Sequence, residues 1–288
     1  MNSPSYNKPI LQNEEPIYIL LPVHNRVAIT LKFIDCLLQQ TYENFQLILI
    51  DDGSIDGTSE AVKKKLKNVD IISGDGNLWW AGCLNKGFDW LEANNISEDS
   101  IVLIINDDVI FDANFIHIGI NLLKQNEKTL LLSRFRNKES GKTIETGMFA
   151  DFSKLHFTTA TSPEKINCLS TRGLFLYWRD IKKIGHFNSR LLPHYGSDYE
   201  YTIRAYRKGY KLVTSDQLSL IYDVDRVNPI NKDAGSFQLN IIKMFDRRYV
   251  MNPLVWTKLV LLTSPWQWLL PNLIRVWYRT FKSLAFST

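Results

Sequence analysis

Short runs of apolar residues alternate with segments of helical periodicity along the first half of the chain. The apolar runs predict strands over residues 17–23, 45–50, 69–72, 101–105 and 130–133. Apolar positions three and four apart predict helices over residues 27–40, 58–67, 81–93 and 113–125, the second of them capped by Thr58 or Ser59. Because strand and helix alternate over about 120 residues, we expect an α/β fold with right-handed crossovers and a largely parallel sheet covered on both faces.

Polar residues stand at the ends of three of these predicted strands. They are His24, Asn25 and Arg26 after the first strand, Asp51 and Asp52 after the second, and Asn106, Asp107 and Asp108 after the fourth. In open parallel sheets, ligands bind beyond the carboxyl ends of the strands. These side chains are therefore the first candidates for a functional site.

Acids at strand ends favour a nucleoside diphosphate bridged to the protein by a divalent cation. A carboxylate repels phosphate, whereas Mg²⁺ or Mn²⁺ between the two groups neutralises the diphosphate. An aspartate can also accept a hydrogen bond from the edge of a nucleobase. The alternative for any one aspartate is a turn or a helix cap, and three such strand ends in one sheet weigh against that alternative.

Several other site motifs are missing from the sequence. The GxG at Gly74 and Gly76 has Trp79 where the dinucleotide fingerprint requires a third glycine. Neither a GxxxxGK[ST] phosphate loop nor a GxSxG nucleophile elbow occurs. The three cysteines lie far apart without the spacing of metal ligands, so we expect reduced thiols and no zinc site.

The composition is that of a globular protein, with 45% hydrophobic and 22% charged residues among 288. This length fits one large domain, with or without an appendage. Residues 1–15 are polar and lack the apolar core of a signal peptide, and no apolar run reaches the roughly 18 residues of a membrane span. We therefore expect a cytoplasmic protein.

The end of the chain differs from the rest in charge. Residues 241–288 hold seven basic residues and one acid, a net charge of +6, so residues 1–240 carry −2 of the total +4. Four of the eight tryptophans lie there as well. Interleaved aromatic and basic residues suit a helix at a membrane interface. Stacking on nucleic acid and packing on the body or on another subunit are the alternatives.

We expect this tail to form amphipathic helices from about Val250 onward, broken at Pro265 and Pro271. Helical spacing sets three basic residues beside three aromatic ones: Arg275, Arg279 and Lys282 beside Trp277, Tyr278 and Phe281. Such a helix would hold the protein on an anionic membrane face. A subunit contact through the same aromatic residues is the competing hypothesis.

A helix beginning near Ser197 places Glu200 and Arg204 one turn apart, which predicts a structural ion pair. Asp198 is then left at the helix N-terminus, facing the cleft. Its alternative role is to cap the helix, although Ser197 is the better cap.

Three aromatic side chains are further candidates for substrate contacts. Trp79 and Trp80 offer apolar faces on which a sugar ring could stack, or one of them belongs to the core. His194 is a candidate ligand for an acceptor or a phosphate, and otherwise an ordinary hydrogen-bonded histidine.

The chain resembles the family-2 glycosyltransferases of the GT-A fold, and in part their rhamnosyltransferase-like members. The resemblance covers about residues 16–225, and the order and spacing of its motifs make it specific. The segments that carry it are 22–26, 51–58, 76–82, 106–109, 172–173, 184–187 and 193–200.

The resemblance implies a role for each matching residue. Asp198 corresponds to the general base and Asp108 to the metal ligand on the donor diphosphate, with Mg²⁺ or Mn²⁺ as the cofactor. The residues implied for the nucleotide sugar are Pro22, Val23, Asn25, Arg26, Asp51, Asn77, Trp80, Gly82 and Asp107. Those implied for the acceptor are Arg172, His194 and Tyr195.

Two positions depart from the family pattern. Asn106 stands at the first position of the DxD motif, where aspartate is common, and amide oxygens are weaker metal ligands. The stretch from Tyr222 to Asp225 stands where the family often carries a histidine ligand, and Asp223 is the candidate substitute.

Together these patterns predict an inverting, metal-dependent transferase that moves a hexosyl or deoxyhexosyl group from a nucleoside-diphosphate sugar. The expected acceptor is a hydroxyl of a surface glycan or lipid-linked molecule, and nucleic acid is not expected as a partner. A non-catalytic sugar-binding relative and a nucleotidyltransferase are the alternatives. We expect a flexible N-terminus over residues 1–15 and a catalytic domain over 16–240, whose donor half (16–125) and acceptor half (126–240) meet near 125–126. The tail over 241–288 is expected to attach to the cytoplasmic membrane face or to form a homodimer contact.

Overall fold

The computed structural model describes residues 16–138, 140–222, 245–246 and 249–285, and the fold is given for these ranges. The predicted N-terminal segment 1–15 and the candidate ligand Asp223 lie outside them. Nine described strands form one sheet: β1 (Ile17–Val23), β2 (Phe45–Asp51), β3 (Val69–Ser73), β4 (Ile101–Ile104), β5 (Val109–Ile110), β6 (Thr129–Asn137), β7 (Thr143–Glu145), β10 (Leu174–Tyr177) and β11 (Lys211–Tyr222). A separate hairpin consists of β8 (Met148–Asp151) and β9 (His156–Thr159).

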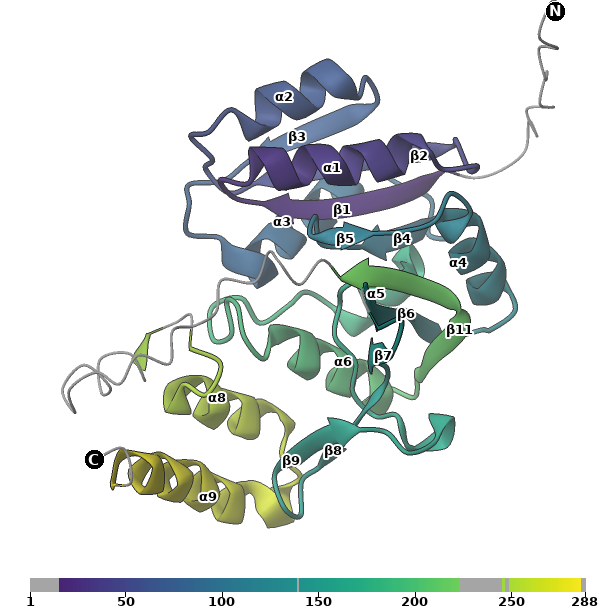
Figure 1. Cartoon of the computed structure of the whole chain (residues 1–288). Helices are drawn as coiled ribbons and strands as arrows, with labels where there is room; N and C mark the ends of the chain where they lie inside the picture. The colour runs from purple at the N-terminus through teal and green to yellow at the C-terminus, as the bar shows by residue number, and fades with distance from the viewer. Residues whose placement is uncertain (1–15, 139, 223–244, 247–248, 286–288) are drawn as a thin grey trace, which may run out of the picture.

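Most of the helices pack around this sheet, and the two nearest the C-terminus lie apart from it, next to the hairpin (Figure 1). The helices are α1 (Val27–Leu38), α2 (Thr58–Lys65), α3 (Trp79–Ala93), α4 (Phe115–Lys124), α5 (Trp178–Ile184), α6 (Ser197–Arg207), α8 (Pro253–Thr263) and α9 (Trp266–Ala285), with a short 3₁₀ turn at Pro163–Lys165. The predicted elements of the first half are all present, and their ends differ from the prediction by at most four residues.

The sheet is parallel at one end and mixed at the other. Its strand order is β3-β2-β1-β4-β10-β6-β11-β5, in which β3, β2, β1 and β4 run parallel. Beyond them β10 is antiparallel to both β4 and β6. Val23 pairs with Asp51, which pairs with Ser73, so the ends of three strands and the polar residues after them meet at one edge.

Two hydrophobic cores bury the two faces of the sheet. Along β1 the side chains of Ile17, Ile19 and Leu21 enter one core and that of Leu20 the other. This alternation is expected for a strand that is covered on both faces. Helices α1, α2 and α4 contribute to the first core, and α3, α5 and α6 to the second.

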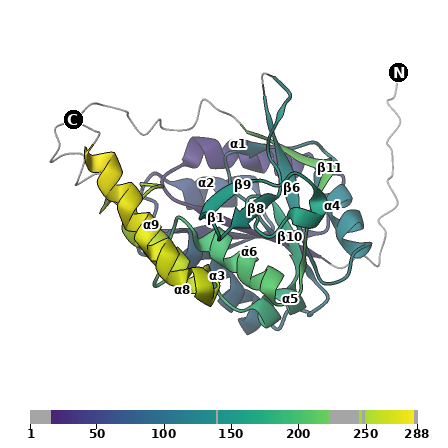
Figure 2. The same cartoon turned by 90° about the horizontal axis from the view of Figure 1, so that it is seen from below.

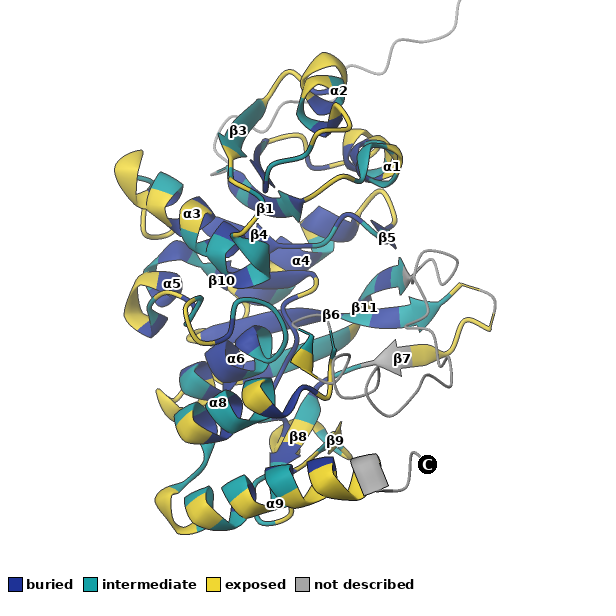
Figure 3. Ribbon diagram, turned by 90° about the vertical axis from the view of Figure 1, so that its left-hand side faces the viewer, coloured by how far each residue is buried: buried dark blue, intermediate teal, exposed yellow. Residues whose placement is uncertain are grey.

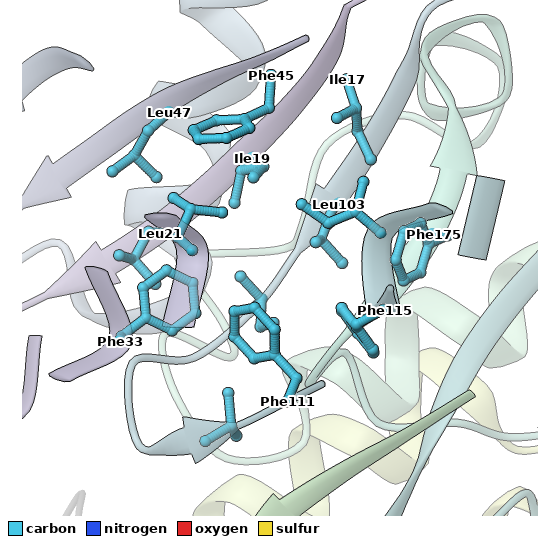
Figure 4. Close-up of a cluster of buried hydrophobic side chains, with 14 of the residues drawn as sticks. Ile17, Ile19, Leu21, Phe33, Phe45, Leu47, Leu103, Phe111, Phe115 and Phe175 are labelled. Atoms are coloured by element: carbon cyan, nitrogen blue, oxygen red, sulfur yellow. The ribbon is translucent and has the colours of Figure 1, made fainter. Parts of the chain in front are cut away.

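Aromatic side chains close the first core between the sheet and its helices. Phe111 lies between Phe33 and Phe115, with ring centroids 5.4 and 5.0 Å away, and Phe115 reaches Phe175 of β10 at 5.5 Å (Figure 4). Edge and tilted contacts of this kind add about 0.5–1.5 kcal/mol each beyond the burial of their surface. They join the parallel part of the sheet to its mixed part.

The N-terminus of α2 differs from the prediction. Gly57, with φ +80°, stands at the cap position, and neither Thr58 nor Ser59 caps the helix. Asp56 does so instead, because its Oδ1 accepts hydrogen bonds from the backbone N–H of Thr58 at 3.1 Å and from the Thr58 hydroxyl at 2.5 Å. A carboxylate outside the helix satisfies the N–H group more strongly than a hydroxyl within it.

The C-terminal helices α8 and α9 lie side by side at the opposite end of the molecule from α1 and α2, next to the hairpin β8–β9 (Figures 1 and 2). Asn252 caps α8 by accepting from the N–H groups of Leu254 and Val255 at 2.8 and 3.4 Å. The predicted break occurs at Pro265, but the predicted break at Pro271 is wrong because α9 continues through it. Pro271 has no N–H group and therefore cannot donate a hydrogen bond to the carbonyl of Gln267. Gln267 is exposed, so water can reach that carbonyl instead.

Candidate active site

The loops after β1 and β2 are joined by hydrogen bonds. The N–H of Asn25 donates to Ser54 Oγ at 2.8 Å, and Asn25 Oδ1 accepts from the N–H of Ile55 at 2.8 Å. Asn25 has φ +49°, a left-handed conformation that asparagine tolerates better than most residues. The N–H of Val27 donates to Asp56 Oδ2 at 2.9 Å and adds a second tie. Pro22 and Val23 therefore end β1 directly beside the Asp51 loop.

Asp51 is buried, and its two carboxylate oxygens both have partners. Oδ1 accepts from the N–H of Ser54 at 2.8 Å, and Oδ2 accepts from the hydroxyl of Ser59 in α2. These bonds fix the carboxylate at the end of β2. The implied contact with a nucleobase stays a prediction.

Asp52 is a residue whose role the sequence reasoning missed. Its Oδ1 accepts from the N–H groups of Gly76 at 2.8 Å and Leu78 at 3.2 Å, and its Oδ2 from that of Trp79 at 2.9 Å. Asp52 therefore caps α3 from another strand end. The sequence held one signal for this role. A helix N-terminus needs acceptors for its N–H groups, yet apart from Asn77 no Ser, Thr, Asp or Asn stands directly before this helix.

Arg26 pairs with two aspartates after β4. Its Nη1 lies 2.9 Å from Asp107 Oδ1, and its Nη2 lies 3.2 Å from Asp108 Oδ2. Asp107 is 1% exposed and also accepts a hydrogen bond from the Thr30 hydroxyl at 2.8 Å. Burial raises the pKa of Asp107 to about 6, although Arg26 and Thr30 act in the opposite direction.

The same strand end offers oxygen atoms that fit a divalent cation. Asn106 Oδ1 and Asp108 Oδ1 are both buried without a hydrogen-bond partner among the described residues. Mg²⁺ and Mn²⁺ prefer such oxygen ligands and retain positions for phosphate oxygens and water. In the described ranges, no three His, Cys, Asp or Glu side chains form a group that could hold a metal.

Asp198, at the start of α6, lines a hollow of about 440 Å³, which we call the acceptor hollow. The structure brings Arg172 and Tyr195 to the same hollow, together with Ser170, whose Oγ is buried without a hydrogen-bond partner in the described part of the chain. The complete lining is Thr146, Met148, Thr159, Ser170, Arg172, Tyr195, Gly196, Asp198, Tyr199, Val250, Val255, Trp256 and Leu259. Hydroxyl, phenol, guanidinium and carboxylate groups therefore share this hollow with apolar side chains such as Val255 and Leu259.

Ser197 does not cap α6 as the sequence suggested. Its hydroxyl donates to the carbonyl of His194 at 2.6 Å, and Gly196 with φ +79° takes the cap position. The predicted pair of Glu200 and Arg204 is confirmed, with nitrogen–oxygen distances of 2.9 and 3.0 Å. Arg204 also donates to the carbonyl of Ile184 at 2.6 Å, which ties α6 to the end of α5.

His194 lies behind the acceptor hollow. Its ring is 4.4 Å from that of Tyr195 and 5.6 Å from that of Trp79, between centroids. Burial lowers the pKa of His194, and the charge of Arg172 lowers it further. The imidazole is therefore held neutral near pH 7, and its predicted contact with an acceptor or phosphate stays a prediction.

The N-terminus of α3 is hydrogen-bonded to two segments that adjoin the acceptor hollow. The N–H of Ala81 donates to the carbonyl of Pro193 at 2.9 Å, and Trp80 Nε1 donates to Thr171 Oγ1 at 3.0 Å. Trp80 packs against the second core, which is the alternative that the sequence left open for one of the two tryptophans. Asn77 is exposed at the preceding loop, and Gly82 lies in the first turn of α3, where its N–H donates to Leu78 at 3.1 Å.

One side of α9 is exposed along the helix (Figure 3), and apolar residues recur there at successive helical turns. Each is at least 60% exposed: Trp266, Leu270, Ile274, Tyr278 and Phe281. Two of the basic residues expected to face a membrane bind the protein itself. Arg279 donates to the carbonyls of Leu155 and Lys154 at 2.9 Å, and Arg275 donates to Asn272 at 2.6 Å. No described helix combines the length and apolarity needed to cross a bilayer.

Comparison with known proteins gives consistent matches. The family model described as glycosyl transferase family 2 matches residues 18–184. An uncharacterized glycosyltransferase of Rickettsia bellii is 28% identical over 149 residues, which are 51% of this chain and 20% of that protein. The amylovoran biosynthesis glycosyltransferase AmsB of Erwinia amylovora is 21% identical over 205 residues, covering 68% of this chain and 65% of AmsB.

A solved structure shares the fold. The mannosyltransferase PcManGT from Pyrobaculum calidifontis, in complex with GDP-Man and Mn²⁺, superposes with a TM-score of 0.54 at 13% identity, over 90% of this chain and 73% of that one. The architecture is thus the GT-A fold expected from the sequence. The chain spans only about a fifth of the length of the first curated relatives that it matches.

Proposed function

The chain belongs to glycosyltransferase family 2, and from this premise we propose that it transfers a sugar from a nucleoside-diphosphate donor to an acceptor hydroxyl with inversion at the anomeric carbon. One observation carries the proposal. Asp198 lines the acceptor hollow, and the start of α3 is hydrogen-bonded both to Asp52 after β2 and to Pro193, two residues before Tyr195 of that hollow.

The donor would lie over the ends of the parallel strands. Asp51 is the proposed contact of the nucleobase, between Pro22 and Val23 on one side and Asn25 and Arg26 on the other. Asn77, Trp80, Gly82 and Asp107 complete the proposed donor site. Asp108 is the metal ligand, with Asn106 as its neighbour, because both residues have an unpartnered buried oxygen. When bound, Mg²⁺ or Mn²⁺ neutralises charge on the diphosphate.

The proposed transfer is a single displacement. The acceptor oxygen forms a bond to the anomeric carbon while the bond from that carbon to the diphosphate oxygen breaks. The leaving nucleoside diphosphate keeps the bonding electron pair, and the hydroxyl proton passes to the carboxylate of Asp198. Arg172 and Tyr195 position the acceptor, and His194 supports Tyr195 from behind.

The acceptor is proposed to be a surface glycan or a lipid-linked molecule, with residues 16–125 serving the donor and 126–240 the acceptor. The tail from residue 241 would attach the protein to an anionic membrane. Its support is the exposed apolar stripe of α9, since an aromatic and aliphatic helix face is suited to the headgroup boundary. A homodimer contact through the same stripe is the alternative.

A non-catalytic, sugar-binding relative is the second candidate, and the pairing of Arg26 with Asp108 favours it. Donor hydrolysis and thermal shift separate the two. A panel of nucleoside diphosphates and their sugars, each with and without Mn²⁺, is tested first for stabilisation of the chain and then for release of free sugar. Mn²⁺-dependent stabilisation followed by hydrolysis supports a transferase. If the ligands stabilise the chain but the donor is neither hydrolysed nor used for transfer to any acceptor, the result would support a non-catalytic sugar-binding protein.

A further inference from the structure

A second hollow of about 440 Å³ lies between the hairpin β8–β9 and the helices α8 and α9. We call it the apolar hollow, because aliphatic and aromatic side chains make up most of its wall. Its lining is Met148, Leu155, His156, Phe157, Tyr199, Tyr249, Val250, Met251, Pro253, Trp256, Val276, Arg279, Thr280 and Ser283. None of the donor-site residues named above belongs to it.

The apolar hollow adjoins the acceptor hollow. Met148, Tyr199, Val250 and Trp256 line both. Phe157 stacks on Tyr199 with ring planes 12° apart and centroids at 5.4 Å, and it meets the edge of Trp256 at 5.4 Å. This aromatic row begins one residue from Asp198 and leads away from it toward the C-terminal helices.

Both hollows have mostly apolar walls, and each also carries charged or polar groups. Those of the acceptor hollow include Asp198, Arg172 and Ser170, and those of the apolar hollow include His156 and Arg279. A ligand that fills both hollows therefore meets apolar side chains along most of its length and the carboxylate of Asp198 at one end. The ligand's hydroxyl end belongs at Asp198.

We propose that the apolar hollow binds the hydrocarbon chain of a lipid-linked acceptor and so delivers its head group to Asp198. The inference rests on the proposed transferase function and specifies its acceptor class. Each buried methylene contributes about 0.8 kcal/mol, so a few methylenes in this hollow supply most of the affinity for the acceptor. The contacts of the sugar in the acceptor hollow would then mainly orient the acceptor and would contribute less to the free energy of binding.

The position of the hollow favours a lipid over a protein segment. Its wall includes α9, whose opposite face carries the exposed stripe from Trp266 to Phe281. Val250 and Met251, at 45% and 55% exposure, form its apolar rim. A hydrocarbon chain that leaves a bilayer in contact with α9 would enter the hollow past Val250 and Met251, which are both uncharged.

Calorimetry with hexyl, octyl and decyl β-glucosides, each below its micelle-forming concentration, tests the proposal on the full chain. We expect the dissociation constant to fall about fourfold for each added methylene, the fold-change equivalent to about 0.8 kcal/mol, until the hollow is filled. Binding of GDP or UDP with Mn²⁺ is measured on the same sample. Nucleotide binding without any dependence on alkyl length overturns this inference and leaves the proposed function intact, whereas absent nucleotide binding counts against the function itself.

A matched pair of variants locates the binding. Met251→Glu places a charge on the exposed rim, and Leu261→Glu places the same charge on an equally exposed residue of α8 (56%) that lines neither hollow. Decyl glucoside should bind the wild type with a lower dissociation constant than hexyl glucoside. Met251→Glu should reduce this ratio of dissociation constants at least tenfold, and Leu261→Glu should leave it unchanged. The two variants should have equal melting temperatures. Equal losses of the decyl-over-hexyl advantage in both variants would overturn the assignment. A dimer that dissociates only in Met251→Glu would also overturn it, because another copy of the chain would then be the occupant of the hollow.

Discussion

The guanidinium of Arg26 lies 3.2 Å from Asp108 Oδ2 and leaves the other oxygen of that carboxylate without a partner in the described ranges. The residue at the end of β1 thereby neutralises part of the charge at the end of β4. Asp108 Oδ1 and the side-chain oxygen of Asn106, two residues earlier, are both buried without a hydrogen-bond partner in the described ranges. The proposed metal site is thus positioned by the loop that also surrounds the proposed nucleotide.

Replacing Asp108 with alanine should weaken Mn²⁺-dependent binding of a nucleoside diphosphate by at least about tenfold. The substitution removes a carboxylate whose Oδ1 is buried without a hydrogen-bond partner in the described ranges. Calorimetry with GDP and UDP in the presence of Mn²⁺ measures the effect. Asp112→Ala, at an exposed position after β5, is the control, and unchanged affinity in Asp108→Ala would refute the metal assignment.

Asp198→Asn should preserve donor binding and reduce transfer by roughly 10²-fold or more, the scale of a missing general base. Asparagine keeps the shape of the side chain, so the melting temperature should be unchanged. Transfer at near wild-type rate would place the base elsewhere. Glu200 is poorly suited to that role, because it is 3% exposed and paired with Arg204.

Asp52→Ala should lower the free energy of unfolding by about 2 kcal/mol, because three N–H groups at the start of α3 lose their acceptor. Asp52→Asn should cost less, since its amide oxygen still accepts. Urea denaturation measures both. Asp75→Ala, which removes one acceptor for the exposed Asn77, is the comparison, and a cost as large as that of Asp52→Ala would show that Asp52 has no special role.

His194 should make the protein less stable in mild acid. Its pKa is lowered in the folded state by burial and by Arg172, so below about pH 6.5 the unfolded chain binds more protons and stability falls with pH. The contribution is bounded by about 1.4 kcal/mol per pH unit. Urea titrations between pH 7.5 and 5 should show a shallower decline for His194→Gln than for wild type. Parallel curves would mean that His194 titrates alike in both states.

Ile274→Glu, in the exposed stripe of α9, should reduce co-sedimentation of the full chain with anionic vesicles, because the charge would enter the headgroup boundary. Ala93→Glu introduces the same charge at an exposed position at the end of α3, outside α9, and is the control. Added salt should weaken wild-type binding. A change in oligomeric state in Ile274→Glu, with vesicle binding absent in every variant, would instead establish the subunit contact.

The sequence by itself determined the elements whose signal is local. Apolar runs located β1, β2, β3, β4 and β6, and helical spacing located the four helices between them. The pair Glu200–Arg204 was also readable, because residues four apart on a helix are always neighbours. The polar strand ends could be assigned to one edge because parallel strands end on the same side.

Tertiary structure decided every relationship between segments distant along the chain. Asp52 meets Trp79 across 27 residues and Arg26 meets Asp108 across 82, and neither pairing has a periodic signature. Pro271 was read as a helix break from its missing N–H, yet contacts of its neighbour Asn272 with Phe152, at 2.9 Å and 120 residues away, help to hold α9 in place. Local sequence reports the conformation of a few consecutive residues, whereas partners and hollows depend on where the packed cores bring remote segments together.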